Sequence, residues 1–247
     1  MLKWLNQLLA GKSSPPAAPT PAAATPALGA IPTAPAHLAL LARFQHAADP
    51  DEVALPYWDS VLPQPVAATL AAFRRQGWLV DAPWQAVFAS RHRVDELKSL
   101  LRERGLKVSG KKDELIARLL ETDSGAMQAR VAQVKAWTLS AEAAEAVARY
   151  IANDRAAKAE AHASALAALQ AGHSRDAIAA IARYERTQVF PRGLGIDWND
   201  EGMAAALLPR TEAILHASPG ILREVPPEEL PALRVAAAMM HLTGENA

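Results

Sequence analysis

The stretch from Arg93 to Glu121 constrains the fold of this 247-residue chain more than any other feature. Its large apolar residues recur every three or four positions in two runs, which is the spacing of one buried face on an α-helix. Gly105 separates the runs, and glycine readily takes the left-handed conformation that ends a helix. Ser109 is placed to cap the second run with its hydroxyl. The stretch is predicted to form a compact pair of helices. The residues expected to face each other are Val94, Leu97, Leu100, Leu101, Leu115, Ile116, Leu119 and Leu120.

Composition predicts an all-α protein around this helix pair. Hydrophobic residues make up 51% of the chain, much of this share is alanine, and aromatic residues make up only 5%. Alanine is the strongest helix former, whereas sheets are richer in β-branched and aromatic residues. The absence of cysteine excludes disulfides, thiolate nucleophiles and Cys-ligated metals, and fits a cytoplasmic location. No run reaches the roughly 18 apolar residues that a membrane span needs.

Changes in composition divide the chain into five parts. The first part carries Trp4 and four leucines at helical spacing, which indicates either an amphipathic docking helix or a frayed terminal helix. The second is rich in proline and alanine and is predicted to be disordered. The five parts are 1–12, the short amphipathic helix; 13–36, the linker; 37–92, a helical lead-in; 93–122, the helix pair; and 126–247, a helical C-terminal domain.

Local signals predict helix boundaries on both sides of the helix pair. Gly77 is expected to end a helix of the lead-in and to be followed by a short apolar tail. Ser140 is expected to cap a long alanine-rich helix. Residues 165–184 resemble the middle of a tetratricopeptide unit, with a helix that ends at Gly172 and a second helix after it. Because only one copy is visible, the likeness predicts a helical hairpin and a surface for a protein partner.

The residues of the helix pair resemble the SAP family with no departure from its pattern. The matching residues are Val94, Leu97 with Lys98, Leu100 with Leu101, Gly105 with Leu106, Ser109 with Gly110, Lys111 or Lys112, Leu115 with Ile116, and Arg118 with Leu119. The resemblance implies a helix-turn-helix module that binds duplex DNA, often A·T-rich DNA, and that usually tethers another activity to it. It covers only a small part of the chain.

The distribution of charge indicates where this module would touch DNA. The whole chain has 26 basic and 26 acidic residues, so attraction to a polyanion must come from a local patch. Lys107, Lys111 and Lys112 flank Ser109 and Gly110 at a helix start, where free backbone N–H groups also favour a phosphate. We expect phosphate-dominated binding with weak sequence preference. The candidate nucleic-acid-binding residues are Lys98, Arg102, Arg104, Lys107, Ser109, Gly110, Lys111, Lys112 and Arg118.

No catalytic, metal or cofactor site is expected. Residues 197–202 begin like a calcium loop, but Leu208 occupies the twelfth place, where a bidentate acid is needed. Residues 193–195 lack the third glycine of a dinucleotide-binding motif. The chain is therefore expected to be a non-enzymatic DNA-binding adaptor, on the nucleoid if it is bacterial, whose C-terminal helices bind a protein partner or a second copy. Two alternatives remain: a protein scaffold whose helix pair is structural, and an accessory part of a DNA-processing enzyme such as a nuclease.

Overall fold

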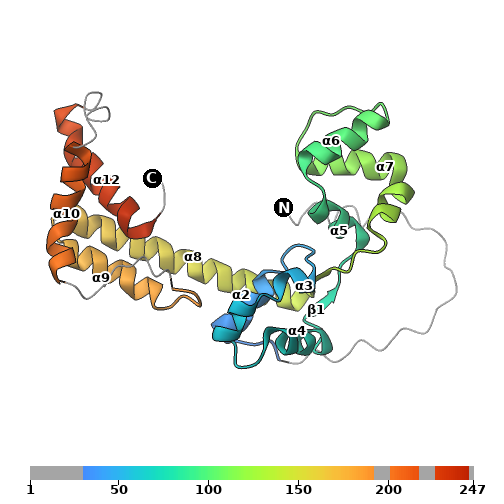
Figure 1. Cartoon of the computed structure of the whole chain (residues 1–247), viewed down its shortest axis with the longest axis horizontal. Helices are drawn as coiled ribbons and strands as arrows, with labels where there is room; N and C mark the ends of the chain where they lie inside the picture. The colour runs from blue at the N-terminus through green and yellow to red at the C-terminus, as the bar shows by residue number, and fades with distance from the viewer. Residues whose placement is uncertain (1–29, 192–200, 217–225, 245–247) are drawn as a thin grey trace.

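The computed structural model describes residues 30–191, 201–216 and 226–244, and in these ranges the fold is all-α with one small sheet (Figure 1). The predictions for residues 1–12, 193–195 and most of 13–36 and 197–202 lie outside the described residues. The helices are α2 (Pro35–Ala42), α3 (Pro50–Val53), α4 (Val66–Arg75), α5 (Trp84–Arg91), α6 (Val94–Glu103), α7 (Lys112–Val131), α8 (Ala141–Gln170), α9 (Ser174–Glu185), α10 (Glu201–His216) and α12 (Leu230–Thr243). Two 3-10 turns, η1 (Pro56–Ser60) and η2 (Pro227–Glu229), and two strands, β1 (Leu79–Asp81) and β2 (Trp137–Leu139), complete the described elements. Helix α2 begins at Pro35, inside the predicted linker, because proline is well suited to the first turn of a helix.

The described residues form three hydrophobic cores, and helix α8 contributes to two of them. We name the parts around them the first lobe (30–81 and 137–151), the inserted lobe (82–136) and the C-terminal lobe (161–244). Helix α8 has 30 residues, and at about 1.5 Å per residue it is about 45 Å long. Its first turns complete the core of the first lobe and its last turns belong to the C-terminal lobe, so one helix connects the two.

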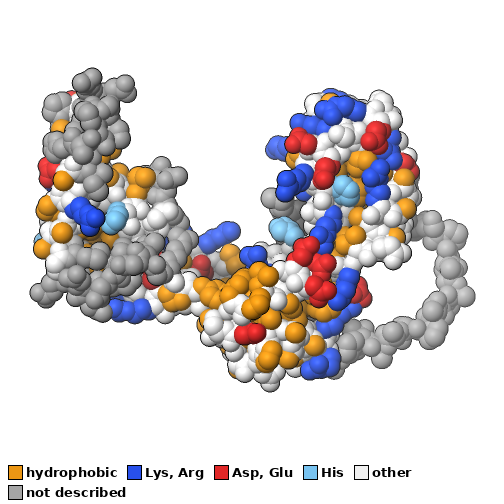
Figure 2. Space-filling model, viewed as in Figure 1, with side chains coloured by type: hydrophobic (Ala, Val, Ile, Leu, Met, Phe, Trp, Pro, Cys, Tyr) orange, Lys and Arg blue, Asp and Glu red, His pale blue; other side chains and the backbone are white. Residues whose placement is uncertain are grey.

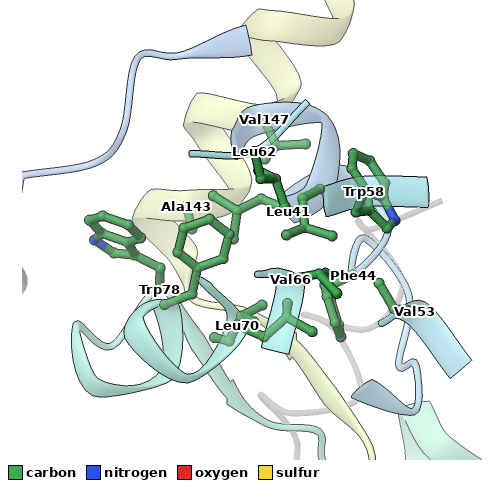
Figure 3. Packing of buried hydrophobic residues seen from close by; sticks show 13 residues of the cluster. Leu41, Phe44, Val53, Trp58, Leu62, Val66, Leu70, Trp78, Ala143 and Val147 are labelled. Atoms are coloured by element: carbon green, nitrogen blue, oxygen red, sulfur yellow. The ribbon is translucent and has the colours of Figure 1, made fainter. Parts of the chain in front are cut away.

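The core of the first lobe joins segments that are far apart in the sequence. Figure 3 shows Phe44, Trp58 and Leu70 pointing toward one another with Ala143 and Val147 of α8. Phe44 is completely buried and Trp58 is 3% exposed. The chain thus returns after the helix pair to complete a core that begins within residues 37–92.

A two-stranded antiparallel sheet closes the base of the inserted lobe. Strand β1 pairs with β2, Leu79 opposite Leu139 and Asp81 opposite Trp137. Trp137 also exchanges backbone hydrogen bonds of 2.9 and 3.0 Å with Ala48. The apolar tail predicted after Gly77 is thus a strand, and residues 82–136 are an insertion between two paired strands. Met127 also packs in the inserted lobe, so this lobe continues past the end of the predicted helix pair.

The C-terminal lobe begins with the predicted helical hairpin. The Ser140 hydroxyl caps α8 by accepting a hydrogen bond of 3.3 Å from the Ala143 amide, and Gly172 ends α8, as predicted. Helix α9 then packs back along α8, and α10 and α12 cover the pair. The buried residues of this lobe include Ala161, Ala165, Leu169, Ala177, Ile178, Ile181, Val235, Ala238 and Leu242. Within the described ranges, no helix is both long and apolar enough to cross a membrane.

Candidate nucleic-acid interface

The predicted helix pair is formed by α6 and by the first part of α7. Leu97, Leu101, Leu115 and Leu119 have no exposed surface, and the facing residues as a group are buried or half-buried apart from Val94, which is 37% exposed. Helix α5 and the last turns of α7 pack against the pair and add further apolar side chains to its core. The pair is therefore one layer of a larger lobe, whose remaining surface is free to carry charge.

The turn between the two helices starts as the sequence predicts. Gly105 has a φ of 65°, and its amide donates a hydrogen bond of 3.0 Å to the Arg102 carbonyl. The Leu106 amide donates to the Leu101 carbonyl at 2.9 Å, which completes the hydrogen-bond pattern of a glycine-terminated helix. Residues after Gly105 leave the helix axis and reach α7 through an extended turn.

The start of α7 differs from the prediction. The cap residue is Lys111, which makes no side-chain capping bond, so the hydroxyl of the exposed Ser109 does not cap this helix. The turn runs two residues further because Gly110 has a φ of 128°, a conformation that L side chains rarely adopt. A β-carbon at Gly110 would also overlap the side chain of Glu114. Glycine is therefore needed here for the shape of the turn.

The first turn of α7 presents free donors. The backbone N–H groups of Lys112, Asp113 and Glu114 donate no hydrogen bond to a described residue. Such groups sum with the helix dipole to favour an anion. Asp113 and Glu114 in the same turn oppose a phosphate through their charge, so the neighbouring lysines have to supply the net attraction.

Arg104, one of the predicted binding residues, is used inside the fold. Its Nε and Nη2 atoms donate to Asp123 Oδ2 at 3.1 and 2.9 Å, and Nη1 donates to the Leu100 carbonyl at 3.1 Å. The side chain is only 19% exposed. Its charge is thus neutralised by an acid that lies outside the predicted helix pair, which the sequence pattern did not reveal.

Asp123 breaks helix α7 at the end of the pair. Its φ and ψ of −150° and 60° are not helical, and its Oδ1 accepts a hydrogen bond of 3.2 Å from the Ala126 amide, which starts the helix again. The hydrogen bonds from Arg104 and then from the Ala126 amide hold the pKa of Asp123 below its usual value. Helix α7 is therefore interrupted at a single residue, directly after the predicted helix pair.

Arg118 is also held by the backbone. Its Nη1 atom donates to the Lys107 carbonyl and, at 3.4 Å, to the Ser109 carbonyl, so the guanidinium spans the turn from inside. Its side chain is half-buried. Arg118 therefore fixes the shape of the turn that carries Lys107, Ser109 and Gly110.

The remaining predicted cations are available to a ligand. Arg102, Lys107 and Lys111 are exposed, whereas Lys98 and Lys112 are half-buried. None of the five makes an ion pair with a described residue. Figure 2 shows blue Lys and Arg side chains over the lobe that contains α6 and α7, with red acidic side chains between them.

Two arginines before α6 behave differently from each other. Arg91 pairs with Asp49 at 3.3 Å and with Glu52 at 2.7 Å, which ties the inserted lobe to the first lobe. Arg93 is exposed and has no ion pair among the described residues. The sequence prediction did not include Arg93 in the site, because a residue just before a helix carries no periodic signal.

The buried hairpin, its glycine turn and the cations without an ion pair to a described residue define a small helical module with a basic turn. Residues 92–124 match the family model of the SAP domain, so the chain contains a SAP domain, as the resemblance of its residues predicted. This assignment indicates nucleic-acid binding in general. No curated protein and no solved structure matches the chain. In the described ranges, no group of three or more His, Asp or Glu residues is placed to hold a metal ion.

Proposed function

We propose that this protein is a non-enzymatic adaptor that binds the phosphates of duplex DNA through its SAP domain. The observation that carries the proposal is the match at residues 92–124 on a turn whose lysines have no ion pair in the described part of the chain. Arg104 and Arg118 have structural roles in this proposal. The residues proposed to contact DNA are Lys98, Arg102, Lys107, Lys111 and Lys112, with the backbone of Ser109 and Gly110 and the first amides of α7.

The physics of this surface predicts how binding depends on salt. Each phosphate that a cation neutralises releases counterions, so five cations correspond to a slope of about −4 to −5 in a plot of log affinity against log salt concentration. Ammonium groups contact phosphates without reading bases, and Arg102 alone in this set has the planar geometry for base recognition. Affinity should therefore vary little between duplexes, with any preference for A·T-rich DNA arising from groove shape.

Titration of a labelled duplex at several salt concentrations tests the proposal. Changing Lys107, Lys111 and Lys112 together to glutamate should weaken binding and reduce the salt slope by about three, roughly one for each lysine. The matched control changes Arg75, Arg155 and Arg186 to glutamate, since these three are exposed and lie outside the inserted lobe. The control has the same net charge as the test variant and should bind much more tightly. Equal affinities of the wild type and the test variant would remove the DNA proposal.

The C-terminal lobe is proposed to bind the protein partner of this adaptor. Its helices α10 and α12 border a groove of about 310 Å³ that is lined in part by Leu207, Leu215 and Met240. Met240 is 39% exposed, so this wall of the groove offers apolar surface to a partner. A pull-down before and after nuclease digestion distinguishes protein partners that bind directly from those that are held through DNA. Partners that survive digestion while the purified protein ignores DNA would support the scaffold alternative.

A further inference from the structure

A cluster of three aromatic side chains lies at the edge of the first lobe, away from the SAP domain. Tyr57 and Trp58 of η1 are stacked with ring centres 5.4 Å apart. Phe190, which follows α9, meets them edge-on at 5.2 and 5.0 Å. The cluster therefore joins η1 of the first lobe to the segment that follows α9 in the C-terminal lobe.

This aromatic cluster is largely open to solvent. Tyr57 is 46% exposed, Phe190 is 40% exposed, and Leu55 directly before η1 is 43% exposed. These are half of the six large hydrophobic residues that are exposed in the described ranges. Pro56 and Pro191 beside them are exposed as well. A contiguous apolar patch of this kind on a folded surface is typical of a binding site.

The cluster also contains hydrogen-bond donors without acceptors. Trp58 is 3% exposed, and its Nε1 atom is buried with no hydrogen-bond partner. A ligand does not reach this buried atom, so the donor that the cluster offers at its surface is on Tyr57, which is 46% exposed. The Tyr57 hydroxyl makes no hydrogen bond with a described residue. Exposed aromatic faces combined with a Tyr O–H donor match a polyproline II segment, whose rings pack on aromatic faces and whose carbonyls have no internal partner.

We propose that the aromatic cluster binds the proline-rich segment Pro15–Pro21 of the same chain. This segment, PPAAPTP, has four prolines in seven residues and no charge, so it complements an uncharged aromatic surface. Proline restricts the backbone before binding, which lowers the entropy cost of docking. The segment lies outside the described residues. Its short connection to the first lobe favours it over a proline-rich segment of another protein.

The choice rests on where the described chain begins. Ile31 packs against the core of the first lobe, and that core includes Trp58. Residues 22–30 separate Pro21 from Ile31, and nine residues can span up to about 30 Å when extended. The tether is long enough to reach the edge of the same lobe. It is also short enough to hold the segment at an effective concentration in the millimolar range, which favours it over a free ligand.

Spin labels can test the docking in the full-length protein, because the chain has no cysteine to replace. The test protein carries Ala18→Cys in the segment and Gln64→Cys in the first lobe, where Gln64 is exposed. Double electron–electron resonance should give a narrow distance distribution for the docked segment. Dilution with unlabelled protein should leave it unchanged, since the contact is within one chain.

Three variants of this labelled protein decide the proposal. Changing Tyr57 and Phe190 together to alanine should remove the narrow component. Changing all four prolines of the segment to alanine should remove it too, and this variant leaves every described residue unaltered. Leu166→Ala, which alters a residue 39% exposed in the C-terminal lobe, should keep it. A broad distribution in the parent protein, a narrow one that survives the first two variants, or one that disappears on dilution would overturn the proposal. The last of these results would mean that the segment docks on a second copy.

Discussion

The inserted lobe and the C-terminal lobe are both helical, but their cores are built from side chains of different size. The inserted lobe buries large residues such as Phe88, Leu101, Leu119 and Met127, each with no exposed surface. The C-terminal lobe instead buries many alanines, namely Ala161, Ala165, Ala177, Ala182 and Ala238. Large side chains at fixed spacing form a pattern that differs from the exposed face of the helix. Buried alanines do not form such a pattern, because alanine is also common on the exposed face.

This difference gives the inserted lobe the stronger periodic pattern of large apolar residues. The SAP match ends at residue 124, close to the break of α7 at Asp123, and includes the leucines that fill the helix pair. In the C-terminal lobe the packing of α8 on α9 depends on close approach of helix backbones, which small residues permit. Both lobes are helical, so the size and spacing of the buried side chains, and not the helical content, distinguish the helix pair in the sequence.

Two opposite substitutions, one in each lobe, test whether the two cores differ in packing, and they should have the largest effects. Leu101→Ala should destabilise the inserted lobe by about 2–5 kcal/mol, because it opens a cavity in a core of large residues. Ala165→Leu should destabilise the C-terminal lobe by about 1–3 kcal/mol, because the close helix contact has no room for three more carbons. Ala167→Leu on the exposed side of α8 is the control and should have little effect. Urea unfolding followed by circular dichroism measures all three. If Ala165→Leu matched its control, the alanine core would not be closely packed.

The sequence predicted those features that depend on neighbouring residues. The two apolar stripes, the ends of helices at Gly105 and Gly172, and the Ser140 cap each involve residues within about five positions of one another. Hydrogen bonds of this range follow from propensity and capping rules. The helix pair of the SAP domain is also local, which is why its residues could be assigned before the fold was known.

Features that join distant segments could not be predicted from one chain. Strands β1 and β2 have three residues each and lie on either side of the inserted lobe, so no alternation of apolar residues was long enough to identify them. In the candidate site, the sequence showed that Arg104 and Arg118 are charged but gave no sign of their partners. Arg104 is 19 positions from Asp123, and Arg118 is 11 positions from the Lys107 carbonyl. Tertiary structure therefore decided which cations stay available.

Both lobes end a helix at a glycine, so glycine substitutions compare the stability cost of the same change in the two lobes. Gly105 and Gly172 have φ of 65° and 79°, and a β-carbon at either would meet no atom within 4 Å. Gly105→Ala and Gly172→Ala should each therefore cost about 1–2 kcal/mol, from the left-handed conformation alone. Gly125→Ala is the matched control, since this glycine lies in the helical part of α7 with equal space around it. It should stabilise the protein by about 0.5 kcal/mol. Thermal unfolding measures the set, and unequal costs at Gly105 and Gly172 would show that the two lobes differ in more than their cores.

The smallest expected effect concerns the ion pair between Arg104 and Asp123 at the helix break of the inserted lobe. Because Arg104 lowers the pKa of Asp123 in the folded state, the unfolded chain binds the proton more readily, and the ionised carboxylate stabilises the fold. This contribution should be complete above the ordinary Asp pKa of about 3.9 and should be lost as the pH falls through the lower folded value. The difference in unfolding free energy between the wild type and Asp123→Asn should therefore be present at pH 7 and shrink toward pH 3. It should be modest, since the Asp123 side chain is 39% exposed and water screens the pair.

The Arg104→Met background separates this charge effect from the cap that Asp123 provides to Ala126. Without the guanidinium, Asp123→Asn should change stability by a smaller amount, and the change should vary less with pH, because the amide of Asn can still accept the Ala126 hydrogen bond. Chemical unfolding of the four proteins between pH 3 and 7 completes the double-mutant cycle. A pH dependence of equal size in both backgrounds would assign the effect to the cap. The restart of α7 would then depend on the local cap from Asp123 to Ala126 and not on the ion pair with the distant Arg104.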